Sequence, residues 1–167
     1  MSKLNLVKFQ KDDFEDYYRL VSNESVMAQI TERAIPLEEA RSNYEKVLLS
    51  NKRSDLLGSY KIMSEDQFLG LGHVTLKEAY EAEIGYMLLP PFWGRGYGTE
   101  VARMLIELAE QTDVKKLMAT IDPNNIASRK ILVNQQFVSE KVCEIDGLPG
   151  EILSRRLSES ILEEIEQ

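Results

Sequence analysis

A glycine-rich turn lies between a predicted strand and a predicted helix in the middle of the chain. Its sequence, Trp-Gly-Arg-Gly-Tyr-Gly-Thr-Glu, occupies residues 93–100 and follows an apolar run that ends at Pro90 and Pro91. After the turn, apolar residues recur at the three-and-four spacing of an amphipathic helix. Glycine lets a ligand approach the backbone without a Cβ in the way, and a helix start offers unpaired N–H groups. The turn therefore predicts an anion-binding site, most often for a phosphate.

Length and composition limit the class of protein. With 167 residues, 43% hydrophobic and 29% charged, the chain is expected to form a single soluble domain over residues 1–167, with an acidic tail at 158–167. No apolar run approaches a membrane span and no signal-peptide pattern opens the chain, so we expect a cytoplasmic location and no membrane partner. The net charge of −8 argues against nucleic acid as the main partner.

The sequence gives no sign of a disulfide framework or a metal site. Cys143 is the only cysteine and His73 the only histidine, and the two have no ligand spacing. His73 lies in a predicted strand, where we interpret it as a structural histidine rather than a base. A monomer and a homodimer both remain open.

Hydrophobic periodicity predicts the order of the elements. The opening strand is expected at 3–9, followed by short helices, the last of which starts at Pro36. The later elements are strands at 56–63, 68–76 and 81–89, a helix at 96–111, a strand at 115–121, a helix at 126–135 and a hairpin of strands at 137–145 and 151–157. This order predicts the α/β (α+β) class, with a mixed sheet flanked by helices rather than a doubly wound parallel sheet.

Two familiar interpretations of a glycine-rich turn do not fit. A phosphate-binding loop of nucleoside triphosphatases has Lys-Ser/Thr after its last glycine, whereas Gly98 is followed by Thr99 and Glu100. A dinucleotide fingerprint has the spacing Gly-x-Gly-x-x-Gly, whereas the glycines here are Gly94, Gly96 and Gly98.

The turn resembles the acetyl-coenzyme A loop of the GNAT family of N-acetyltransferases. The family signature is Gln/Arg-x-x-Gly-x-Gly/Ala, and Trp93 in its first position is typical of the branch that contains the ribosomal-protein N-terminal acetyltransferases. Ile-Gly-Tyr at 84–86 and Asp-Pro-Asn-Asn-Ile-Ala-Ser at 122–128 also resemble that branch. The resemblance covers roughly residues 3–157.

The resemblance implies the GNAT fold and a co-substrate. The fold is a mixed, mostly antiparallel sheet of about seven strands flanked by helices, in which the central fourth and fifth strands splay apart. Acetyl-CoA is the implied co-substrate, with its pyrophosphate on the backbone of the turn and its pantetheine arm along the strand at 81–89. The residues implied to contact it are Met87, Leu88, Leu89, Trp93, Gly94, Arg95, Gly96, Tyr97, Gly98, Thr99, Asn125 and Ser128.

The resemblance also implies a reaction, the direct attack of a primary amine on the thioester in a ternary complex. The acceptor would be a protein N-terminus or a small amine. The amine has to lose a proton and the departing thiolate has to be stabilised. Glu83, on the strand expected to face the acceptor, is the first candidate for the base, although a surface-facing glutamate fits equally. Ser128 is the candidate donor to the thiolate, because Leu132 stands where many relatives have a tyrosine acid.

Two other functions remain open from the sequence. Because that tyrosine position is unfilled, the domain could bind coenzyme A without transferring acetyl, as a sensor or partner module. A nucleotide-binding protein is the third possibility, and it would bind ATP or NAD more tightly than coenzyme A.

Overall fold

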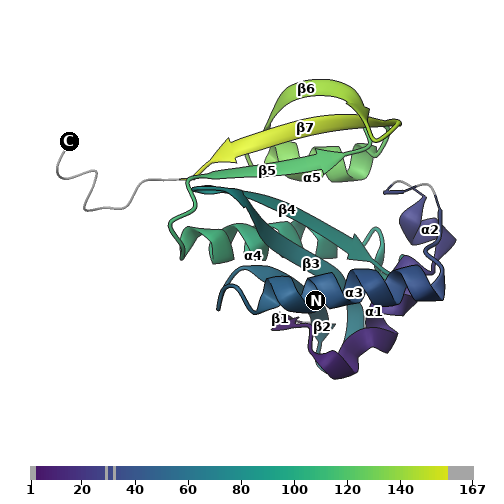
Figure 1. The fold of residues 1–167 in the computed structure, drawn as a ribbon. Coiled ribbons are helices and arrows are strands. Elements are labelled where there is room, and N and C mark those ends of the chain that lie inside the picture. Colours follow the sequence, from purple (N-terminus) through teal and green to yellow (C-terminus); the bar gives the residue numbers. More distant parts are fainter. Residues whose placement is uncertain (1–2, 29, 32, 158–167) are drawn as a thin grey trace.

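The computed structural model describes residues 3–28, 30–31 and 33–157; the predicted acidic tail lies outside them. Seven strands form one sheet in the order β1-β2-β3-β4-β5-β7-β6 (Figure 1). Neighbouring strands are antiparallel except β4 and β5, which are parallel. The strands are β1 (Leu4–Lys8), β2 (Gly58–Ser64), β3 (Gln67–Glu78), β4 (Glu81–Leu88), β5 (Lys116–Ile121), β6 (Val138–Ile145) and β7 (Leu148–Arg156). This confirms the predicted mixed, mostly antiparallel sheet.

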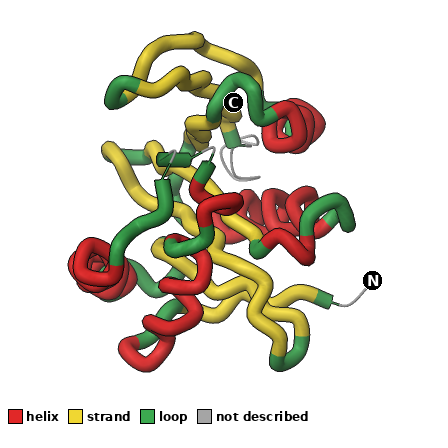
Figure 2. The backbone as a smooth tube through the Cα atoms, turned by 90° about the vertical axis from the view of Figure 1, so that its right-hand side faces the viewer, coloured by secondary structure: helices red, strands yellow, loops and turns green. Residues whose placement is uncertain are grey.

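Helices cover both faces of the sheet, as Figure 2 shows with strands between two layers of helix. They are α1 (Phe14–Val21), α2 (Glu24–Met27), α3 (Leu37–Asn51), α4 (Tyr97–Glu110) and α5 (Ile126–Asn134), with 3₁₀ turns η1 (Lys11–Asp13) and η2 (Pro90–Phe92). Helices α1 and α3 pack on β3 and β2, and α4 packs on β3 and β4. None of the helices in the described ranges is long and apolar enough to cross a membrane.

Helix α4 is held to the sheet by the apolar stripe that the sequence predicts. Val101, Leu105 and Ala109 are fully buried, at the three-and-four spacing of one helix face. Gly72 on β3 lies directly beneath this face, because a Cβ there would be 3.3 Å from a methyl carbon of Leu105. The stripe therefore sets the position of the first turn of α4, which directly follows Gly94 and Gly96.

The C-terminal hairpin is closed by a two-residue turn, so that β7 begins at Leu148 and not at residue 151 as expected from the sequence. Ile145 pairs with Leu148, and the intervening Asp146 and Gly147 have φ angles of 51° and 82°. A positive φ at both central positions is the geometry that Asp-Gly favours in tight hairpins. The turn lets β7 return along the whole of β5, with pairs from Lys116–Arg156 to Ile121–Glu151.

Candidate functional site

The site begins where β4 and β5 separate. The two strands pair only at Glu81–Glu83 with Lys116–Met118, after which β4 follows β3 and β5 follows β7 (Figure 1). A cleft of about 730 Å³ lies along the resulting gap. Beyond Glu83, no strand in the described part of the chain pairs with the edge of β4 that faces β5. Apart from the Leu88 oxygen, which accepts a hydrogen bond from Trp93, the backbone groups of this edge are available to an extended ligand. This is the predicted splay of the central strands.

The glycine turn lies at the wide end of this cleft. Gly94 and Gly96 have φ angles of 71° and 83°, and no atom lies within 4 Å of where a Cβ would be at either one. These glycines supply backbone conformations that other residues rarely adopt, above open space. In the described part of the chain, the N–H groups of residues 94–96 donate no hydrogen bond, and the helical ladder begins at Glu100 N–H to Gly96 O. The turn therefore offers an uncovered set of donors at a helix start.

Trp93 fastens the turn to the end of β4. Its indole Nε1 donates a hydrogen bond of 2.7 Å to the backbone oxygen of Leu88. About half of its side chain remains exposed, and Trp93 lines the cleft. Trp93, which stands where the family signature has Gln or Arg, thus connects the edge of β4 directly to the glycine turn.

The cleft also contains an unpartnered hydroxyl group. Within the described residues, the Tyr86 hydroxyl oxygen is buried and has no hydrogen-bond partner. Burial raises the pKa of Tyr86, and the nearby Ser128 side chain lowers it to a lesser degree without the geometry of a hydrogen bond. Buried polar groups are normally satisfied. The Tyr86 hydroxyl, between α4 and α5, is therefore available to form a hydrogen bond with a ligand in the cleft.

Helix α5 brings Asn125 and Ser128 to the opposite wall of the cleft. The Asn125 side chain caps the helix, because its Oδ1 accepts a hydrogen bond of 3.2 Å from Ser128 N–H. Arg129 Nε lies 3.1 Å from Glu151 Oε1 on β7, which ties the first turn of α5 to the sheet. The nearby Ser139 side chain and the Arg129 guanidinium lower the pKa of Glu151, so this carboxylate is ionised at neutral pH.

Glu83 and His73 lie on the other face of β4. Thr75 pairs with Glu83 and His73 pairs with Gly85, and residues directly opposite on paired strands share a face. Both Glu83 and His73 line the cleft, together with Ser25, Val26 and Ile30 from α2 and the loop after it. The cleft is therefore bounded by the glycine turn, Tyr86 and Ser128 on one side of β4 and by a carboxylate and an imidazole on the other.

Most of the residues predicted to bind acetyl-CoA come together in this cleft. Its lining includes Met87, Leu88, Trp93, Gly94, Gly96, Gly98, Thr99, Asn125 and Ser128, and also the predicted base Glu83. Glu81, two residues earlier on the same face, is not part of the lining. The sequence interpretation of His73 as structural missed its position in the cleft.

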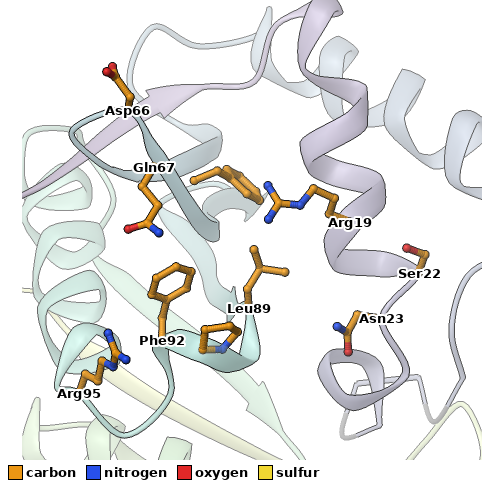
Figure 3. Close-up of a pocket in the computed structure, with 10 residues that line it drawn as sticks. Arg19, Ser22, Asn23, Asp66, Gln67, Leu89, Phe92 and Arg95 are labelled. Atoms are coloured by element: carbon orange, nitrogen blue, oxygen red, sulfur yellow. The ribbon is translucent and has the colours of Figure 1, made fainter.

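Three predicted contacts lie elsewhere. Leu89 and Arg95 line a second cavity of about 930 Å³, which also includes Arg19 at its opposite end (Figure 3). The Leu89 N–H is already bonded to Leu69 O at 2.8 Å. The Tyr97 ring packs edge-on against Phe92. For these three residues, contact with acetyl-CoA through the side chain remains a prediction.

Over residues 3–28, 30–31 and 33–157, no group of three or more His, Cys, Asp or Glu side chains is arranged to hold a metal ion. The only cysteine, Cys143, is half-buried on β6.

Comparison with known proteins agrees with this geometry. The family model described as Acetyltransferase (GNAT) domain matches residues 3–138. An uncharacterized N-acetyltransferase of Bacillus subtilis (strain 168), YnaD, is 23% identical over 134 residues, which cover 78% of this chain and 76% of that protein. A second one, YoaA from the same organism, is 25% identical over 136 residues, covering 80% and 72%.

Solved structures share the fold. The RimL ribosomal L7/L12 N-acetyltransferase in complex with coenzyme A superposes with a TM-score of 0.79 at 18% identity, covering 94% of this chain and 96% of that chain. Spermidine N-acetyltransferase from Vibrio cholerae, in complex with coenzyme A and spermine, has a TM-score of 0.77 at 15% identity, covering 92% and 95%.

A splayed sheet with a glycine turn at a helix start, open beside an unpaired strand edge, defines an acyltransferase that uses a coenzyme A thioester. The chain belongs to the GNAT acetyltransferase family, whose model spans most of its length. It is an acetyl-CoA-dependent acetyltransferase. The family and enzyme class predicted from the sequence are thereby confirmed.

Proposed function

We propose that residues 1–167 form a single domain that transfers the acetyl group of acetyl-CoA to a primary amine, either a protein N-terminus or a small amine. The observation that carries this proposal is that Glu83 lines the same cleft as the glycine turn, on the opposite face of β4. Donor and acceptor then approach the gap from opposite sides. Solved structures with this fold include a ribosomal-protein N-acetyltransferase and a spermidine N-acetyltransferase, which supports both classes of acceptor.

In the proposed reaction, donor and acceptor form a ternary complex in which the donor lies along the edge of β4. Backbone N–H groups of the turn hold the pyrophosphate. The pantetheine arm lies along the edge of β4 at Met87 and Leu88, where the Leu88 oxygen also accepts the Trp93 indole. Glu83 attracts the ammonium form of the acceptor and removes its first proton, directly or through water. The free amine then attacks the thioester carbon. Ser128 donates a hydrogen bond to the sulfur as the C–S bond breaks.

A thiol-release assay tests this proposal. The protein is incubated with acetyl-CoA and, separately, with N-terminal peptides, lysine-containing peptides, polyamines and amino acids, and free thiol is measured over time. Cys143 contributes a fixed background that does not grow with time. We expect steady release with at least one acceptor class. Saturable binding of coenzyme A without release on any amine would favour the sensor module instead, and tighter binding of ATP or NAD would favour a nucleotide-binding protein.

Replacing Glu83 by glutamine is expected to lower kcat about 100-fold, since positioned general bases contribute factors of that size. The affinity for coenzyme A should be unchanged, because Glu83 lies on the face of β4 away from the turn. Initial rates across a pH series measure the effect. Glu81→Gln is the matched control, because Glu81 shares the strand and face but lies outside the cleft. Wild-type turnover and pH dependence in Glu83→Gln would remove Glu83 from the role of base.

Replacing Ser128 by alanine is expected to lower kcat by roughly 5-fold, the size of one neutral hydrogen bond to the leaving sulfur. Ser128→Thr keeps the hydroxyl and should keep most of the activity. Steady-state kinetics at saturating acceptor measure both variants. Equal losses in the two variants would indicate that Ser128 supports the start of α5 rather than the sulfur.

A further inference from the structure

His73 projects from β3 into the acceptor side of the cleft, and the proposed reaction so far gives it no role. It pairs with Gly85, while its neighbour Thr75 pairs with Glu83, so both cleft-lining side chains stand on one face of the sheet. That face is the one away from α4, because the alternate residue Gly72 lies under Leu105. The imidazole of His73 and the carboxylate of Glu83 thus both lie near the middle of β4, on the face away from α4 where the acceptor is proposed to enter.

The two ring nitrogens of His73 have different surroundings. Nδ1 lies 3.0 Å from the Thr75 hydroxyl oxygen. Nε2 lies directly above Gly85, because a Cβ at Gly85 would be only 2.6 Å from it. Glycine at this position therefore leaves room for the ring to lie across β4. With a proton on Nδ1 that is donated to Thr75, Nε2 presents a free lone pair.

Burial, more than the charges around it, keeps the ring neutral. Glu83 is the charged side chain that faces the same part of the cleft from β4, Lys77 contributes from β3, and α2 contributes the uncharged Ser25 and Val26. Burial, and secondarily the charge of Lys77, lower the pKa of His73 to about 4. The imidazole is thus unprotonated at neutral pH and able to accept a proton.

Amide formation from an ammonium ion releases two protons from nitrogen. The first leaves before attack, when the ammonium becomes an amine, and Glu83 is placed to assist that step. The second leaves as the C–N bond forms, because the attacking nitrogen becomes positively charged and strongly acidic. A carboxylate that has just accepted the first proton cannot accept the second until it has released the first.

We propose that His73 is a second catalytic residue, whose Nε2 accepts the proton lost by the acceptor nitrogen as it bonds to the acetyl carbon. This inference rests on the proposed function. In the step, the C–N bond forms and the C–S bond breaks. The nitrogen proton moves to Nε2, and the sulfur leaves with the bonding electron pair and takes a proton from water. The imidazolium, disfavoured by its burial, then returns its proton to water, so that protons and charge balance over the cycle.

The tautomer of His73 is a first test, independent of turnover. His73 is the only histidine in the sequence, so in tag-free protein labelled with ¹⁵N-histidine its two ring nitrogens give the only imidazole signals. At neutral pH, with and without coenzyme A, we expect a protonated Nδ1 and a bare Nε2. A proton on Nε2 at neutral pH would overturn the proposal whether or not an acceptor has been found.

Kinetics with two kinds of amine form the second test. Against a strongly basic amine, His73→Gln and Glu83→Gln should each lower kcat about 100-fold. A weakly basic amine such as methoxyamine is already unprotonated at neutral pH, so the defect of Glu83→Gln should largely disappear. The defect of His73→Gln should persist, because bond formation still releases a proton. A His73→Gln variant as active as the wild type would overturn the proposal. So would a His73→Gln variant whose activity is restored by weakly basic amines, as is expected for Glu83→Gln.

A double-mutant cycle shows whether Gly85 and His73 act through the same contact. Gly85→Ala should displace the imidazole and reproduce the kinetic defect of His73→Ala, while adding almost nothing to it in the double variant. Additive losses in kcat would mean that Gly85 matters for the strand and not for the ring, and would count against the proposal. If the wild type acetylates no amine, the proposed function is wrong. If the wild type is active and the His73 variants have the same kcat, only this inference is wrong.

Discussion

Gly96→Val is expected to weaken coenzyme A binding by about 100-fold. Gly96 has a φ of 83° and precedes the first turn of α4. A side chain in this left-handed conformation costs about 1–2 kcal/mol, and β-branching adds to the cost. No atom lies within 4 Å of the position of a Cβ, so the valine would meet no protein group and would instead fill the space above the unpaired N–H groups. Losing two such contacts to a phosphate, at about 1.5 kcal/mol each, gives the expected factor.

Backbone strain alone would also weaken the fold, so the prediction needs a matched control. Gly147 has nearly the same φ, 82°, and equally open surroundings, but it lies in the β6–β7 turn outside the cleft lining. Gly96→Val and Gly147→Val should therefore lose similar amounts of stability in urea denaturation. Calorimetric titration should show the loss of affinity only for Gly96→Val. Wild-type affinity in Gly96→Val would mean that the turn does not hold the donor.

The order and type of the elements were predictable because local patterns determine them. The stripe of α4, with Val101 and Leu105 facing the sheet, is visible as spacing. The C-terminal hairpin was also predictable, but the expected turn was too long, because Asp146-Gly147 closes it in two residues and β7 begins at Leu148. The open backbone of the glycine turn at a helix start was also predictable, because it depends on consecutive residues. For these features, tertiary contacts only reinforce what neighbouring residues already favour.

The acceptor side of the cleft was not predictable in the same way. Whether His73 faces the cleft depends on its pairing with Gly85, and that register depends on contacts along the whole of β3 and β4. A shift of one residue would turn His73 to the α4 face. The sequence does contain one usable signal, a glycine in the next strand, but only the pairing shows that it lies beneath the imidazole.

The orphaned hydroxyl of Tyr86 and the link from Trp93 to Leu88 were missed for a related reason. Both depend on where side chains end in space rather than on their spacing along the chain. Ser128 was identified by resemblance to a motif, but its closeness to Tyr86 depends on the packing of α5 against α4. The sequence thus predicts more of the residues that line the site than of the contacts between them.

Gly70→Ala should be the most destabilising small substitution in the sheet. A Cβ on Gly70 would lie 2.0 Å from the backbone oxygen of Met87 and 2.9 Å from the Cα of Leu88. Both atoms belong to the backbone of β4, so no side chain can rotate away, and β3 and β4 have to separate. Overpacking of this kind costs about 3 kcal/mol or more of the free energy of unfolding.

The same displacement should reach the donor site. Met87 and Leu88 line the cleft, and Leu88 O accepts the Trp93 indole bond that fastens the glycine turn. Gly70→Ala is therefore expected to lower both the urea midpoint and the affinity for coenzyme A. Gly72→Ala is the matched control, because its Cβ would meet only the side chains of Leu105 and Val101, at 3.3 and 3.4 Å, which can adjust. Equal midpoints for the two variants would contradict the close contact of β3 with β4. A large loss of stability in Gly70→Ala with unchanged affinity in the folded fraction would show that the donor edge tolerates movement of β4.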